Sequence, residues 1–207
     1  MIAAAIREID RRRSEVLTDE ALRLVLYRDE IRKYGLREGA EIPTEVLGEI
    51  LGTLLPKRAK LRAMELLKAR DYTEAGLLSK LLDGGYPEEI AGEAVSYVKS
   101  FGYIDDARYA RSYIRSHIER NSRVKLRGEL LRRGVEEEIA EEALEACYAD
   151  ALVYDGDPEL LQIRRLMEKK HFDAATASYE ERQKFLAAAA RRGLPVDRVR
   201  RVMEERE

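Results

Sequence analysis

An internal repeat constrains this chain more than any other feature of its sequence. Ten of the eighteen residues from 77 to 94 recur at an offset of 49, where average composition predicts about one match. Two related segments of this length indicate a tandem array of one small unit. The residues of the first copy are Leu77, Leu81, Leu82, Gly85, Glu88, Glu89, Ile90, Ala91, Glu93 and Ala94, which recur as Leu126, Leu130, Leu131, Gly134, Glu137, Glu138, Ile139, Ala140, Glu142 and Ala143.

Each copy carries the signals of short amphipathic helices. Thr73 and Ser122 occupy matching positions before a helix, where a hydroxyl accepts a hydrogen bond from a free backbone amide. Gly85 and Gly134 lie where that helix should end, a position that favours a left-handed backbone. Helices this short are marginal alone in water and must bury their apolar faces against neighbours. We therefore expect Leu81 with Ile90, and Leu130 with Ile139, to be equivalent buried pairs.

A weaker third copy follows the first two. Gly193 takes the place of the helix-ending glycine, and Ser178 with Glu181 three residues later forms a capping-box pattern. A leading helix is expected at 158–170, with Asp157 as its cap and a proline at its first position. The unit is thus three helices used three times, at 57–104, 105–152 and 153–207. Stacked units of this kind predict a mainly α fold in the form of an elongated, curved rod.

Residues 1–56 differ from the repeats. Short β-tolerant segments separated by a polar turn predict a hairpin, and glycine or proline flanks two helical segments. We expect a small β-hairpin and helix element before the repeats. Its predicted parts are strands at 12–17 and 22–27 and helices at 28–34 and 44–54, the last of which ends before Pro56.

Composition narrows the class of protein. Charged residues make up 38% of the chain, yet 38 Lys and Arg nearly balance 40 Asp and Glu, for a net charge of −2. A general nucleic-acid binder is usually basic, so nucleic-acid affinity would have to come from a local patch. Cys147 is the only cysteine, which fits a reducing compartment. The apolar run at 1–6 is too short for a membrane span and is followed at once by charges, so we expect a cytoplasmic protein.

A glycine-aromatic turn leads into an acidic-capped helix in the segment 101–116, which reads Phe-Gly-Tyr-Ile-Asp-Asp-Ala-Arg-Tyr-Ala-Arg-Ser-Tyr-Ile-Arg-Ser. This segment is very similar to the signature of the RecX family, whose members regulate filaments of the RecA recombinase. The resemblance extends over residues 8–205. Two stretches depart from the family pattern: 187–190 is all alanine, and 121–124 lacks a glycine common there. The remaining segments that carry the resemblance are 32–39, 66–81, 183–186 and 191–193.

The resemblance implies a function as well as a fold. It implies three tandem three-helix repeats and no catalysis, and we also expect a monomer without a cofactor. It also implies binding to the RecA–DNA filament, which would modulate the recombinase, with inhibition as the expected direction, in DNA repair and the SOS response. Weak direct contact with DNA is compatible with this function. The alternative is a direct DNA-binding protein whose three-helix units act as helix-turn-helix readers, and the near-zero net charge counts against it.

The most polarised stretch is the candidate binding site. Residues 108–133 hold nine positive and two negative side chains, and six glutamates follow between 136 and 145. Arg108, Arg111 and Arg115 share one helical face, opposite Tyr109, Tyr113 and Ile114. Such a face can pair with acidic side chains or with DNA phosphates, although a charge run is often only solvated surface. The candidate residues are Arg108, Arg111, Arg115, Arg120, Arg123, Lys125 and Arg127.

Features that might suggest an enzyme or a metal site have simpler interpretations. Asp105 and Asp106 suit a helix cap and the positive end of a helix dipole. His117 and His171 have no second ligand at zinc spacing. Cys147 matches Val98 of the first copy and is interpreted as a buried apolar residue. Most of the eleven tyrosines are expected to pack in the core with their hydroxyls at its edge.

Overall fold

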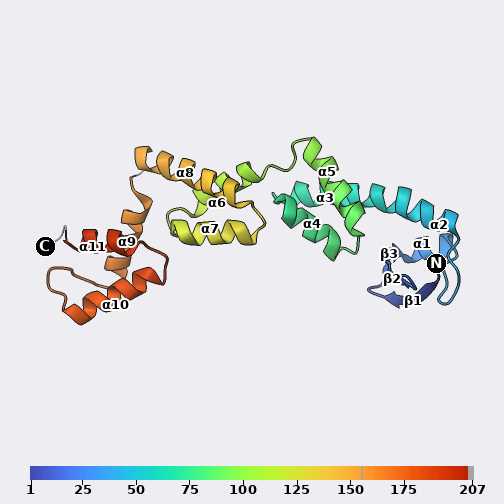
Figure 1. Ribbon diagram of the computed structural model, residues 1–207, viewed down its shortest axis with the longest axis horizontal. Coiled ribbons are helices and arrows are strands. Elements are labelled where there is room, and N and C mark those ends of the chain that lie inside the picture. The colour runs from blue at the N-terminus through green and yellow to red at the C-terminus, as the bar shows by residue number, and fades with distance from the viewer. Residues whose placement is uncertain (155, 205–207) are drawn as a thin grey trace. The chain divides into compact units, whose positions relative to one another are not determined.

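A computed structural model describes residues 1–154 and 156–204, mostly as helices (Figure 1). The chain divides into two compact units, the first spanning Met1–Asp105 and the second beginning at Asp106. The elements of the first unit are β1 Ala3–Glu8, β2 Arg13–Thr18, β3 Arg23–Tyr27, α1 Arg28–Lys33, α2 Thr44–Glu49, the π-helix η1 Ile50–Leu54, α3 Leu55–Ala69, α4 Glu74–Asp83 and α5 Glu88–Ser100. Those of the second are α6 Asp106–His117, α7 Arg123–Arg132, α8 Glu137–Tyr154, α9 Pro158–Lys169, α10 Tyr179–Ala190 and α11 Val196–Glu204.

The N-terminal sheet has three antiparallel strands in the order β1-β2-β3. The hairpin of β2 and β3 confirms the prediction, but the prediction omitted β1, which begins within the apolar run at the N-terminus. Ile6 pairs with Val16, and Val16 pairs with Leu24 across the sheet. Three of the six β1 residues are alanine, which is depleted in strands. Pairing with β2 therefore decides the conformation of this segment, and the segment's own composition does not reveal it.

The helix predicted at 44–54 does not end before Pro56. The helical path continues from α2 through η1 into α3, and Pro56 lies in the first turn of α3. A proline lacks the backbone N–H that an α-helix needs, and its ring crowds the preceding turn. The wider π turn directly before Pro56 changes the hydrogen-bond pattern at that point. The proline therefore marks a change of helix type, and the predicted boundary was wrong.

The N-terminal element and the first repeat share one apolar core. Buried residues from β2, β3 and η1 form a single cluster with those of α3, α4 and α5. Arg58 of α3 connects the two parts: its Nη1 donates to Glu30 of α1 at 2.7 Å, and its Nη2 donates to the carbonyl of Val25 in β3. Both members of the Arg58–Glu30 ion pair are more than four-fifths buried. The sheet is thus part of the folded body of the first unit.

The capping signals of the first two repeats are confirmed. The Thr73 hydroxyl accepts from the amide of Gly76 at 3.0 Å, and that of Ser122 accepts from the amide of Lys125 at 3.4 Å. Gly85 has a φ of +83°. All strands that the structure describes lie before residue 28, as the repeat interpretation requires.

The expected buried pairs are confirmed with one exception. Leu81, Ile90 and Leu130 are buried. Ile139 is only half-buried, although it packs against the core of the second repeat. The two copies of the unit therefore share their pattern but not their degree of burial at this position.

The third repeat also follows its sequence signals. The Asp157 carboxylate accepts from the amide of Glu159 at 2.9 Å, and Ser178 with Glu181 forms the expected capping box. Its core includes the stacked rings of Phe172 and Phe185, whose centroids lie 4.3 Å apart. These three helices form an apolar cluster separate from that of the second repeat. The extended rod and the residue limits of each repeat stay predictions.

We expect Ile114→Ala to destabilise the second unit. Ile114 is fully buried in the core of α6, α7 and α8, and removing its side chain should leave a cavity that costs about 2 to 5 kcal/mol of unfolding free energy. Arg111→Ala, one turn earlier on the exposed face, should stay within about 0.5 kcal/mol of the parent. Urea unfolding followed by circular dichroism measures both. Equal losses for the two variants would contradict this assignment of faces.

Candidate functional site

Helix α6 has a basic face on its exposed side, and its opposite side is packed into the core of the second repeat. Ala110 and Ile114 are fully buried, whereas Arg108, Arg111 and Arg115 are exposed. This separation follows from the helical period, because residues three and four apart share a face. The predicted outward position of the three arginines is confirmed. Asp105 directly precedes α6 and Asp106 lies in its first turn, where negative charge is favourable.

The tyrosine face of α6 is less buried than predicted. Tyr109 and Tyr113 are half-buried, and their rings stack with centroids 6.4 Å apart. Arg133 lies over the Tyr113 ring at 4.5 Å, and the Tyr113 hydroxyl donates to Glu129 of α7. Burial, and then this bond to a carboxylate, raise the pKa of Tyr113. The hydroxyls lie at the edge of the core as expected, but the two stacked rings are also at this edge and are not enclosed by the core.

Among the seven candidate cations, at least four are engaged by carboxylates within the second unit. Arg115 lies 3.3 Å from Asp150 of α8. On α7, Arg127 Nε donates to Glu141 at 2.6 Å, and its Nη2 pairs with Glu137. The bond to Glu141 is the largest influence that raises the pKa of Arg127. The remaining pairs are Arg123 with Glu141 at 3.3 Å and Lys125 with Glu129 at 4.0 Å.

Arg120 and Lys125 line a groove that the sequence did not predict. The groove lies between the second and third repeats, within the second unit, and has a volume of about 550 Å³. Its other cations come from α9 and from the turn after α10. Sequence reasoning missed them because they are about 40 to 70 positions away in the chain from Arg120. The ten lining residues are Glu119, Arg120, Lys125, Gln162, Arg165, Leu166, Lys169, Arg191, Arg192 and Leu194.

Hydrogen bonds between the two repeats hold the walls of this groove in place. Gln162 of α9 is buried, and its Nε2 donates to the carbonyls of Ile118 at 2.7 Å and Asn121 at 3.1 Å. The Ser122 hydroxyl donates to the carbonyl of Arg192 at 2.7 Å. The close approach of the turn after α10 depends on Gly193, where an added Cβ would lie 2.6 Å from the Ser122 oxygen. The groove is therefore built by specific contacts.

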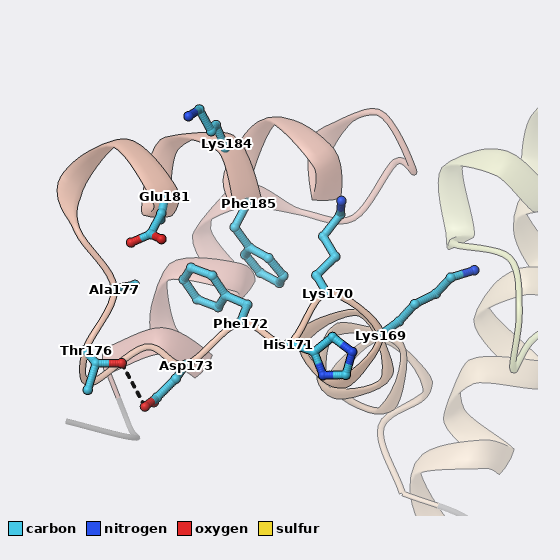
Figure 2. A pocket seen from close by; sticks show the side chains of 10 residues that line it. All are labelled: Lys169, Lys170, His171, Phe172, Asp173, Thr176, Ala177, Glu181, Lys184 and Phe185. Atoms are coloured by element: carbon cyan, nitrogen blue, oxygen red, sulfur yellow. Dashed lines mark hydrogen bonds between the residues drawn. The ribbon is translucent and has the colours of Figure 1, made fainter.

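A second hollow lies within the third repeat (Figure 2). Phe172 and Phe185 lie side by side in it, and the Thr176 hydroxyl donates to Asp173 at 2.9 Å. Its charges are mixed, with three lysines beside Asp173 and Glu181. Opposite charges so close together favour internal pairing, so this hollow has less net charge to offer a ligand than the groove.

The part of the chain that the structure describes has neither a metal-ligand cluster nor a membrane-spanning helix. Among residues 1–154 and 156–204, no group of three His, Cys, Asp or Glu side chains is placed to hold a metal ion. In the same ranges, every helix is too short or too polar to cross a membrane. Cys147 is buried, and burial raises the pKa of its thiol. That environment suits the predicted apolar role.

Comparisons with known proteins agree with the repeat architecture. Residues 59–97 match the model of the first three-helix domain of RecX, and residues 105–144 match that of the second. The regulatory protein RecX of Trichlorobacter lovleyi is 33% identical over 158 residues, which cover 74% of this chain and 99% of that protein. The regulatory protein RecX of Caldanaerobacter subterraneus is 37% identical over 137 residues, which cover 66% of each chain.

Solved structures show the same fold. A crystal structure of a regulatory protein RecX matches with a TM-score of 0.63 over 98% of both chains, at 18% identity. The structure of RecX from Lactobacillus salivarius matches with a TM-score of 0.57 over 72% of this chain and 97% of the other, also at 18% identity. The family assignment rests on the sequence relatives, and the two solved structures show the fold. This chain belongs to the RecX family.

Proposed function

We propose that this chain regulates a recombinase by binding the RecA–DNA filament, without chemistry of its own. The observation that carries the proposal is the exposed arginine face of α6. The opposite side of this helix, with Ala110 and Ile114, is buried in the core. Arg111 has no ion-pair or hydrogen-bond partner for its side chain among the described residues, and Arg115 has one partly exposed carboxylate. A preformed cationic face on a stable helix can meet acidic side chains or DNA phosphates with little reorganisation.

The proposed mode of action follows from the repeats. Stacked helical units offer an extended surface, which can contact several neighbouring protomers of a filament. Binding in this way would block access of DNA to the filament, so the proposed effect is inhibition. We further propose that the chain acts as a monomer in the cytoplasm. The names of the relatives, which call them regulatory proteins, support a regulatory role.

Filament binding and direct DNA binding can be separated by salt. With a net charge of −2, binding to bare duplex DNA should be weak and should fall steeply between about 50 and 200 mM salt. Binding to nucleotide-bound RecA filaments should persist, because contacts between proteins include apolar area that salt does not screen. A pull-down with filaments, free RecA and bare DNA at both salt concentrations measures this. Tight, salt-resistant binding to bare duplex DNA would instead support the helix-turn-helix alternative.

A further inference from the structure

The groove between the second and third repeats concentrates positive charge. Six of its ten lining residues are cationic, and Glu119 is the one carboxylate among them. Glu119 is already engaged by Arg165, at 3.3 Å. The cations come from three places in the chain: the segment around the start of α7, helix α9 and the turn after α10. The fold therefore brings together charges that the sequence keeps apart.

Most of these cations are not neutralised by the protein. Elsewhere on the second repeat, arginines lie beside carboxylates, as Arg123 and Arg127 do beside Glu141. In the groove, four exposed cations have no ion-pair or side-chain hydrogen-bond partner among residues 1–154 and 156–204. They are Arg120, Lys169, Arg191 and Arg192. Like charges that converge without counter-charges repel one another, and a bound anion would relieve that repulsion.

We propose that this groove binds the phosphates of a nucleic-acid strand. A protein-binding groove would be expected to offer apolar or aromatic anchors at its centre. Here the only apolar side chains in the lining are Leu166 and Leu194, and both are buried. The lining also lacks an aromatic ring that could stack on a base. Arginine and lysine without such anchors are typical of contacts with the phosphate backbone, which position a strand and do not read its sequence.

The groove is also suited to phosphate by its arginines. Four of its six cations are arginines, whose planar guanidinium groups can donate two parallel hydrogen bonds to one phosphate. The hydrogen bonds of Gln162 and Ser122 connect the two repeats that carry these arginines. This inference goes beyond the proposed function, because the groove should bind an oligonucleotide when no recombinase is present.

The test is fluorescence anisotropy of a labelled thymidine strand of about 20 nucleotides, long enough to fill a site of this size, titrated with the full chain at about 50 mM salt. R191Q/R192Q should weaken binding about tenfold and reduce the slope of log affinity against log salt by about 1.4, or 0.7 for each lost contact. R200Q/R201Q removes the same charge from exposed positions on α11 outside the groove. This control should change affinity less than about twofold.

Three further comparisons keep the test decisive. The double variant R120Q/K169Q removes two cations from the other walls of the groove and should weaken oligonucleotide binding by the same factor. The test therefore remains valid even if R191Q/R192Q misfolds. Equal losses in the groove variants and the α11 control would overturn the proposal, because binding would then depend on net charge alone. Displacement of the strand by a glutamate-rich peptide at equal charge would overturn it in favour of an acidic protein segment. A filament pull-down of the same variants reports separately on the proposed function.

Discussion

Replacing Gly85 with alanine should lower the unfolding free energy of the first unit by about 2 to 5 kcal/mol. Gly85 has a φ of +83°, a left-handed conformation that costs a residue with a Cβ about 1 to 2 kcal/mol. An added Cβ would also lie 2.1 Å from Cγ2 and 2.8 Å from Cβ of Val25 in β3. Forcing extra volume into a packed core costs about 1 to 3 kcal/mol more. Urea unfolding of the full chain measures the loss.

Gly35→Ala is the matched control in the same unit. Gly35 also has a positive φ, +62°, but an added Cβ there would meet nothing within 4 Å. Its loss should therefore be limited to the backbone cost, about 1 to 2 kcal/mol. In addition, Val25→Ala should partly rescue Gly85→Ala, with a coupling of at least about 0.5 kcal/mol in a double-mutant cycle. Equal losses at the two glycines, with no coupling to Val25, would refute the close contact between sheet and repeat.

The two roles of Gly85 show where sequence reasoning reaches its limit. Its place at the end of α4 was predictable, because the helix stop depends on local spacing and on the matching Gly134. Its contact with Val25 was not predictable, because the two residues are 60 positions apart and no local pattern connects them. The same reason explains the missing strand β1, whose conformation depends on a partner strand. The helix caps and glycine turns of the repeats are local features, and they were predicted correctly.

The residues of the candidate site also divide into those that local spacing predicts and those that depend on distant contacts. The outward face of α6 followed from spacing alone, since Arg111 and Arg115 are four residues apart. The pairing of Arg123 and Arg127 with glutamates of α8 could have been suspected from the acidic run that follows, but which cations are paired depends on packing. The groove depended on the contact between two repeats, which Gln162 and its bonds to the α6–α7 connection establish. The sequence signal that comes closest is the Arg-Arg pair before Gly193.

Reversing charge on α6 should abolish most filament binding while leaving the fold intact. In R111E/R115E, two exposed arginines become glutamates. The Arg115–Asp150 pair that is lost is largely exposed, with side chains 66% and 59% accessible. Such a pair contributes at most about 1 kcal/mol. The filament presents phosphates or acidic side chains under the proposed function, so each reversal replaces attraction with repulsion. At about 1.4 kcal/mol or more for each site, affinity should fall about a hundredfold.

The control for this reversal is R200E/R201E, which changes the charge equally on exposed positions of α11. It should bind filaments within about threefold of the parent, because only long-range, salt-screened repulsion remains. A melting curve and a filament-binding isotherm for each protein complete the experiment. If R111E/R115E melts normally and binds like the parent, the α6 face is solvated surface and the contact lies elsewhere. If that variant keeps filament binding while R191Q/R192Q loses it, the groove between the second and third repeats is the surface through which the chain reaches its partner.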